Sequence, residues 1–131
     1  MSTPTRETLE VFDNPCPERD YEITHVAHEF TSVCPITGHP DFATMTLRYV
    51  PGALCVELKS LKLYLQAYRN EGVFYEALTN KILDDLAAVC SPKRMMLTAA
   101  FTRRGGLSSV VVAQVPADAG PWPAAQPGHP S

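Results

Sequence analysis

The sequence lacks the features that mark several classes of protein. Its 131 residues carry a net charge of −3, so no basic surface points to a nucleic acid or an anionic membrane. No apolar run approaches the ~18 residues that cross a membrane. Residues 1–7 have no apolar core of the kind found in a signal peptide. These absences predict a cytoplasmic protein whose thiols stay reduced.

Closely spaced cysteine pairs are also missing. The four cysteines are Cys16, Cys34, Cys55 and Cys90. None of them forms a C-x-x-C pair, which argues against a zinc ribbon or a thioredoxin-type motif. A zinc site could still combine His25 and His28, spaced H-x-x-H, with Cys34 and His39. The alternative is that both histidines are partly exposed polar residues at the end of a strand, and we predict no metal.

Length and composition fit one folded domain with two flanking segments. Apolar residues make up 45% and charged residues 19% of the chain, as in ordinary globular proteins. Residues 1–20 are polar and contain prolines, so we expect an irregular arm. Residues 21–115 hold all the predicted strands and helices. Residues 116–131 are rich in proline and alanine, which predicts a disordered tail.

Alternating and β-branched stretches predict five strands, over residues 21–26, 42–50, 53–58, 94–101 and 107–115. The stretch 42–50 alternates most clearly, with Ala43, Met45, Leu47 and Tyr49 on one face. Because Pro51-Gly52 is a turn signal, we expect 53–58 to pair back on 42–50 as a hairpin. Residues 29–41 are predicted to be a loop.

Two consecutive helices are predicted between the third and fourth strands. Ser60 is expected to cap the first, in which Leu61, Tyr64, Leu65 and Tyr68 recur at helical spacing. The second spans about residues 74–89, with Asp84 and Asp85 facing water. This order predicts an α+β domain, an antiparallel sheet with both helices on one face. The unprotected sheet edges favour oligomerisation.

One turn-rich stretch, residues 32–41, contains a candidate nucleophile. Cys34 lies there among two prolines and a glycine that restrict the loop, and Asp41 follows just before a strand. A thiol held at a fixed angle near an acid suits nucleophilic chemistry. The alternative is that Cys34 is a small buried hydrophobe in a turn.

Two other stretches could bind an anion. Lys59 and Lys62 share a helix face, although a solvated first turn is the plain alternative. The run Arg103-Arg104-Gly105-Gly106 combines guanidinium donors with a loop that lacks β-carbons, where a phosphate could approach the backbone. Its plain alternative is a tight turn.

Taken together, four blocks of sequence resemble the QueF family, the 7-cyano-7-deazaguanine reductases of queuosine biosynthesis, in their short single-module form. The blocks are FTSVCPITGHPDFAT (30–44), ELKSLKLYL (57–65), AYRNEGVFYE (67–76) and FTRRGG (101–106). The resemblance covers roughly residues 20–112. It implies a tunnelling fold whose subunits assemble into stacked rings, with sites at subunit boundaries.

The resemblance also implies a reaction and its residues. The nitrile of 7-cyano-7-deazaguanine would be reduced to an aminomethyl group with two NADPH. Cys34 would form a thioimide with the nitrile carbon, and Asp41 would protonate the nitrogen. The positions implied for substrate binding are Val56, Glu57, Leu58, Tyr75 and Glu76. Those implied for NADPH are Leu58, Lys59, Gly105 and Gly106. Arg103 or Arg104 could meet the cofactor phosphates, and we take Arg104 as the contact.

Two positions depart from the family pattern. Tyr75 stands where many members have histidine, and a phenol with a pKa near ~10 is a poor proton shuttle. Leu78 stands where several members have cysteine, so we expect no protective disulfide with Cys34. Two other functions stay open. One is an amidine-forming relative that uses ammonia on the same thioimide. The other is a zinc-dependent, pterin-type or non-catalytic member of the same fold.

Overall fold

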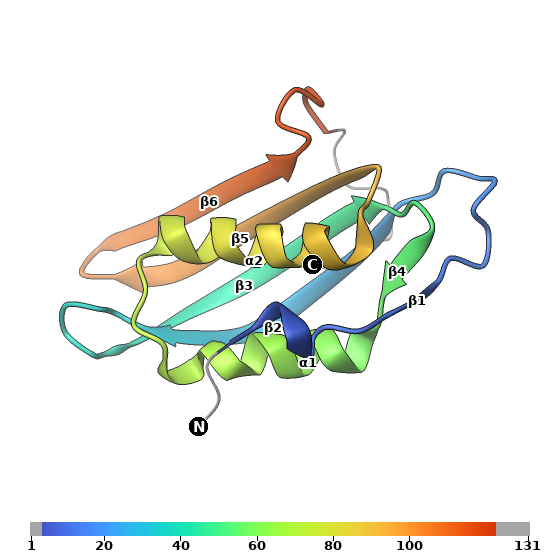
Figure 1. The fold of residues 1–131 in the computed structure, drawn as a ribbon. Helices are drawn as coiled ribbons and strands as arrows, with labels where there is room; N and C mark the ends of the chain where they lie inside the picture. Colours follow the sequence, from blue (N-terminus) through green and yellow to red (C-terminus); the bar gives the residue numbers. More distant parts are fainter. Residues whose placement is uncertain (1–3, 123–131) are drawn as a thin grey trace.

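The computed structural model describes residues 4–122, in which two helices cover one face of a four-stranded antiparallel sheet (Figure 1). In spatial order the strands are β2 (Ile23–Val33), β3 (Pro40–Val50), β5 (Arg94–Arg104) and β6 (Leu107–Val115). The helices are α1 (Leu58–Gln66) and α2 (Tyr75–Cys90), with a 3-10 turn, η2 (Ala67–Asn70), following α1. The predicted α+β architecture is confirmed.

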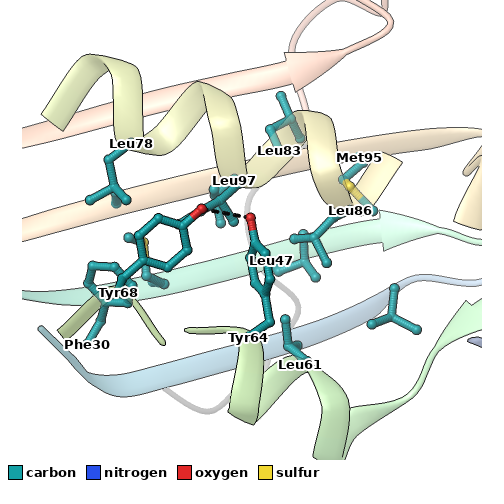
Figure 2. Close-up of a cluster of buried hydrophobic side chains, with 14 of the residues drawn as sticks. Phe30, Leu47, Leu61, Tyr64, Tyr68, Leu78, Leu83, Leu86, Met95 and Leu97 are labelled. Atoms are coloured by element: carbon teal, nitrogen blue, oxygen red, sulfur yellow. Dashed lines mark hydrogen bonds between the residues drawn. The ribbon is translucent and has the colours of Figure 1, made fainter. Parts of the chain in front are cut away.

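Strand β3 lies in the middle of the sheet and sets its inner face. Its odd-numbered residues from Asp41 to Tyr49 are buried, while the even-numbered ones are partly or fully exposed. The predicted alternation is therefore confirmed, and it begins one step earlier than the predicted strand. The buried apolar side chains face α1 and α2 and form the core (Figure 2). Asp41 belongs to the same row and lies at the start of the strand.

The predicted hairpin between 42–50 and 53–58 is wrong. Both edges of β3 are occupied, by β2 and by β5, so no edge is left for the segment that follows it. That segment forms β4 (Leu54–Val56), which pairs antiparallel with β1 (Val11–Asp13). The irregular arm predicted over residues 1–20 is accordingly wrong in part, because it contains β1 and the 3-10 turn η1 (Arg6–Thr8).

The first helix is capped by a different residue from the one predicted. The carboxylate of Glu57, not the hydroxyl of Ser60, accepts hydrogen bonds from the backbone N–H groups of Lys59 and Ser60, both at 2.8 Å. The helix begins two residues before Ser60. The Ser60 hydroxyl instead accepts from the backbone N–H of Glu10 at 2.9 Å and so holds the N-terminal segment against α1.

The second helix carries a buried carboxylate that the sequence placed in water. Asp85 is only 5% exposed, whereas Asp84 is exposed as predicted. Tyr64 donates to Asp85 at 2.5 Å, and Lys81 donates to it at 2.8 Å. The hydroxyls of Tyr64 and Tyr68 lie 2.8 Å apart between the helices (Figure 2). These polar groups are buried because each has a partner.

Part of the predicted tail is packed against the sheet. Trp122 lies between the guanidinium groups of Arg48 and Arg94, at 4.8 and 4.3 Å, and its indole N–H donates to Glu22. The prediction of disorder over 116–131 is therefore wrong for the described part, up to residue 122. Residues 123–131 lie outside the description.

Within residues 4–122, no helix is long and apolar enough to cross a membrane.

The buried carboxylate gives a stability prediction. Asp85→Asn should lower the free energy of unfolding by about 2 kcal/mol, because Tyr64 and Lys81 lose a charged acceptor. Asp84→Asn, at the exposed neighbouring position, should change it by less than ~0.5 kcal/mol. Urea titrations of both variants at pH 7 measure the difference, and equal losses would contradict the role given to Asp85.

The same network gives a pH dependence. Burial opposes ionisation of Asp85, but the hydrogen bonds from Lys81, Tyr64 and Arg6 outweigh it and hold the pKa below its ordinary value. A lowered folded-state pKa stabilises the protein above the unfolded value of ~3.9, and this contribution is lost as the pH falls through the folded value. The stability gap between the parent and Asp85→Asn should therefore narrow below about pH 4.

Candidate active site

A cleft of about 580 Å³ opens where the β2–β3 loop, the start of α2 and the β5–β6 turn meet. These three segments lie at the same end of the sheet (Figure 1). Six of the residues expected at the site line this cleft: Cys34, Asp41, Tyr75, Glu76, Arg104 and Gly105. Segments far apart in the sequence are thus brought together by the fold.

The cysteine loop is shorter than predicted. Strands β2 and β3 extend to Val33 and from Pro40, so only residues 34–39 form the loop, not 29–41. The N–H of Cys34 donates to the carbonyl of His39, and the N–H of Gly38 donates to the carbonyl of Cys34, both at 2.8 Å. Gly38 has a φ of 75°, in the left-handed region that glycine adopts without strain. The loop therefore holds Cys34 by its backbone.

A β-bulge in β2 determines that Cys34, which directly follows the strand, lies on the inner face of the sheet. Before the bulge, His25 and Ala27 lie opposite the buried residues Leu47 and Met45 of β3. The register shifts by one residue between Ala27 and Phe30, after which Phe30 and Ser32 are the buried positions. Because alternate residues share a face, this shift moves the inward row onto the even numbers, and Cys34 shares that parity.

A second bulge selects the arginine that faces the cleft. Phe101 of β5 is buried, and strict alternation would next turn Arg103 inward. The register with β6 shifts between Phe101 and Arg104, and Arg104 lines the cleft. Arg103 is exposed. No signal in the sequence distinguishes the two arginines, since each strand pattern alone is compatible with either.

The start of α2 is fixed beside the cysteine loop by backbone pairing. The N–H of Val33 donates to the carbonyl of Glu71 at 3.0 Å, and the N–H of Val73 donates to the carbonyl of Val33 at 3.3 Å. Gly72, in this parallel bridge, has no side chain, and a β-carbon there would lie 3.4 Å from Cα of Pro35. This close approach brings Tyr75 and Glu76 to the wall of the cleft.

Asp41 lies at the centre of the polar groups in the cleft. Its side chain is 3% exposed and forms an ion pair with Arg104. It also accepts a hydrogen bond from the hydroxyl of Tyr75. The Tyr75 ring stacks on Phe101, with centroids 3.6 Å apart and planes within 7°. Burial, and then the bond to Asp41, raise the pKa of Tyr75, so its hydroxyl stays protonated and orients the carboxylate.

The thiol of Cys34 is partly exposed and ionises more readily than an ordinary cysteine. A hydrogen bond from the Thr37 hydroxyl, then those from the backbone N–H groups of Thr37 and Ile36, hold the pKa of Cys34 below its ordinary value. The charge of Arg104 acts in the same direction. The thiolate is the nucleophilic form of cysteine, so this setting activates it.

The other expected residues lie apart from the cleft. Val56 ends β4, Glu57 caps α1, and Leu58 and Lys59 begin it. They lie at the end of α1 away from η2 and from the start of α2 (Figure 1). The fold of one chain does not bring them to Cys34. The pKa of Glu57 is held low by the backbone N–H groups of Lys59 and Ser60, which its carboxylate caps. Gly106 adjoins the cleft at the β5–β6 turn but is not among its lining residues.

The histidines give no sign of a metal centre. His25 is half-buried within β2, and His28 is exposed in the bulge. Across residues 4–122, His, Cys, Asp and Glu side chains form no group of three that could hold a metal ion. The charged and nucleophilic side chains that line the cleft are Cys34, Asp41, Glu76 and Arg104, and none is a histidine.

A cysteine with a lowered pKa and a buried carboxylate lie on the wall of one cleft of this α+β fold. This arrangement is typical of the class of enzymes that use a cysteine nucleophile. The family model described as "QueF-like protein" matches residues 40–119. The chain therefore belongs to the QueF family. It is an oxidoreductase, like the curated relatives described next.

Curated relatives agree with this assignment. A protein of Rhodopirellula baltica is 54% identical over 114 residues, which cover 87% of this chain and 94% of that protein. One of Nitrosococcus oceani is 60% identical over 113 residues, covering 86% and 87%. Both are named NADPH-dependent 7-cyano-7-deazaguanine reductase.

A solved structure shares the fold. The apo archaeosine synthase QueF-Like aligns with a TM-score of 0.63, covering 72% of this chain and 91% of that one. Its identity to this chain is 22%, so this likeness bears on the fold alone.

The backbone bridge at Gly72 gives a prediction about the site's packing. Gly72→Val should lower the free energy of unfolding by about 1–3 kcal/mol, because its methyl groups need the space of Pro35 and Val33. Gly72→Ala, whose single carbon meets Pro35 at contact distance, should lose less than ~1 kcal/mol. Urea unfolding compares the two variants. A valine variant as stable as the alanine variant would show that this approach is not tight.

Proposed function

We propose that this chain reduces the nitrile of 7-cyano-7-deazaguanine to the aminomethyl group of 7-aminomethyl-7-deazaguanine, with NADPH as reductant. The product serves queuosine biosynthesis in tRNA, and we place the reaction in the cytoplasm. The observation that carries the proposal is the pairing of an activated Cys34 with buried Asp41 in the cleft of a QueF-family chain.

The first step joins the substrate to the protein. The Cys34 sulfur adds to the nitrile carbon, one π bond of the C≡N group breaks, and the nitrogen takes up a proton. Asp41 accepts the thiol proton and returns it to that nitrogen, so the thioimide forms without net gain or loss of protons. Tyr75 and Arg104 hold the Asp41 carboxylate in place for this transfer.

Reduction then needs two hydrides, and NADPH supplies each of them when it is bound. Conversion of the thioimide carbon to CH₂–NH₂ also releases the Cys34 sulfur, so the thiol is regenerated. Two protons taken from water complete the balance, and the same Asp41 carboxyl passes them to the nitrogen and the departing sulfur. Because each NADPH carries one hydride, each turnover uses two.

The residues present fit a phosphorylated cofactor. Gly105 and Gly106 have φ values of 59° and 83°, and no atom lies within 4 Å of the place where a β-carbon would be. Such an open backbone lets a phosphate approach its N–H groups. Arg104 carries donors beyond the two it uses within the chain. Leu58 and Lys59, at the exposed start of α1, complete the proposed cofactor contacts.

Glu76 is the carboxylate we assign to the base. Its carboxylate lines the cleft, whereas the Glu57 carboxylate caps α1. A guanine-like edge presents a ring N–H beside an amino group, and one carboxylate accepts from both. Tyr75 contributes a stacked ring on the same wall. Val56, Glu57 and Leu58 are the remaining proposed substrate contacts.

The proposed site residues lie at two opposite ends of the folded domain, and this separation supports a site shared by two copies. One subunit would supply Cys34, Asp41 and Glu76, and its neighbour the segment from Val56 to Lys59. Rings of subunits repeat such a boundary around a closed circle.

Mass spectrometry of the protein mixed with 7-cyano-7-deazaguanine tests the covalent step. The parent should gain the mass of the substrate, Cys34→Ala should gain nothing, and Cys55→Ala should react like the parent because Cys55 is buried in β4. Adding NADPH to the parent should discharge the adduct with loss of nicotinamide absorbance. An adduct that persists with NADPH and is consumed by ammonia would indicate an amidine-forming enzyme instead. Adduct on Cys34→Ala would rule out the assigned nucleophile.

Mixing two inactive variants tests the shared site. Cys34→Ala and Lys59→Met should each lose most NADPH oxidation. Subunits mixed in equal amounts under reversible dissociation should regain about a quarter of the parental sites, since half of each contributing surface is intact. The control is each variant carried alone through the same treatment. No recovery in a mixture that demonstrably exchanges subunits would place both residues in a site within one chain.

A further inference from the structure

Thr37, in the β2–β3 loop, and Arg104, at the end of β5, both line the cleft beside Cys34 and Asp41. Arg104 donates from Nη1 to Asp41 and from Nη2 to the Thr37 hydroxyl oxygen, the latter at 3.0 Å. We propose that Arg104 and Thr37 are positioning residues for the Cys34 thiolate. Arg104 ties Thr37 to Asp41 and thereby aims the Thr37 hydroxyl at the sulfur. This rests on the proposed function only in giving Cys34 its role as nucleophile.

The bonding of the Thr37 hydroxyl explains its direction. Its oxygen accepts from Arg104 and, at 3.2 Å, from the backbone N–H of His39. A hydroxyl has two acceptor positions and one donor hydrogen. With both acceptor positions occupied by N–H groups, the hydrogen is left to donate. A bond between the Thr37 hydroxyl and the sulfur is the largest cause of the lowered pKa of Cys34. Thr37 therefore acts as a donor to the sulfur rather than as an acceptor of the thiol proton.

The guanidinium of Arg104 links the acid to the nucleophile. Its planar group is rigid, so the bonds to Asp41 and Thr37 fix the positions of these two side chains relative to each other. The Asp41 end is buried at 3% exposure, while the Arg104 side chain is 36% exposed. The buried carboxylate therefore anchors the arginine, and the arginine holds the loop. Arg103 is turned away by the bulge and makes no comparable contact.

This role differs from contact with a cofactor phosphate, because it exists before any cofactor binds. A residue that only held NADPH would act on the free thiol through its charge alone, so Arg104→Lys, which keeps the charge, would leave the thiol unchanged. A residue that positions the thiolate would change it. The reactivity of Cys34 in the absence of substrate and cofactor therefore separates the two roles.

The experiment follows alkylation of Cys34 by iodoacetamide across pH 5–10, with the Cys34 peptide quantified by mass spectrometry. Thr37→Val and Arg104→Met should each move the midpoint of the rate profile up by about one pH unit. Below both midpoints their alkylation should then be about tenfold slower than the parent's. Thr37→Ser keeps the hydroxyl and Arg103→Met is the matched neighbour, so both should follow the parental profile. Urea unfolding of each variant establishes that it is folded.

Parental profiles for Thr37→Val and Arg104→Met would overturn the inference. A shift in Thr37→Val without one in Arg104→Met would overturn the part given to Arg104. So would a parental profile for Arg104→Lys, which keeps the charge but lacks the planar group that bonds both Asp41 and Thr37. If Thr37→Val does not fold, Arg104→Met and Thr37→Ser still decide the matter by the same profiles. The parent is incubated in parallel with 7-cyano-7-deazaguanine. Shifted profiles with no parental adduct would refute the proposed function alone, and a normal adduct with unshifted profiles would refute this inference alone.

Discussion

The alternation of side chains along β-strands, changed in phase at two bulges, is the constraint on which the site depends. Strand β3 places Asp41 on the inner face, where it is the first residue of a buried row. After the bulge in β2, the even-numbered residues face inward, and Cys34 is one of them. The bulge between Phe101 and Arg104 likewise turns Arg104 toward the cleft. A one-residue change in phase reverses the face of every later side chain, so these two shifts decide which groups meet.

The sequence predicted the parts of this arrangement that depend on local patterns. The strand from 42 to 50 follows from alternation, which burial on one face imposes, and the strand at 107–115 follows from its β-branched residues. The bulges could not be predicted, because they depend on pairing with a neighbouring strand. The hairpin predicted for 53–58 failed for a related reason: both edges of β3 are taken by strands from elsewhere in the chain. Cys34, Asp41 and Arg104 were identified by resemblance to a family, and their contacts required the structure.

Charged residues were placed least well, because their partners are distant in sequence. Asp85 lies on a helix face that reads as exposed, yet Tyr64, Lys81 and Arg6 enclose it. Glu57 was expected to meet the substrate, and its carboxylate is used as a helix cap. In both cases the fold satisfies a carboxylate before any ligand is present. The carboxylates on the cleft wall are those of Asp41, which is paired with Arg104, and of Glu76, which we assign to the substrate.

The central claim is that the thiol of Cys34, in the cleft shared with Asp41, forms a bond to the nitrile carbon. A crystal structure of the protein with 7-cyano-7-deazaguanine, without NADPH, tests this claim most directly. The account predicts continuous density from the Cys34 sulfur to that carbon, with Asp41 beside the imide nitrogen and Glu76 at the guanine-like edge. Substrate bound with no density joining it to Cys34, or bound away from the cleft, would contradict it.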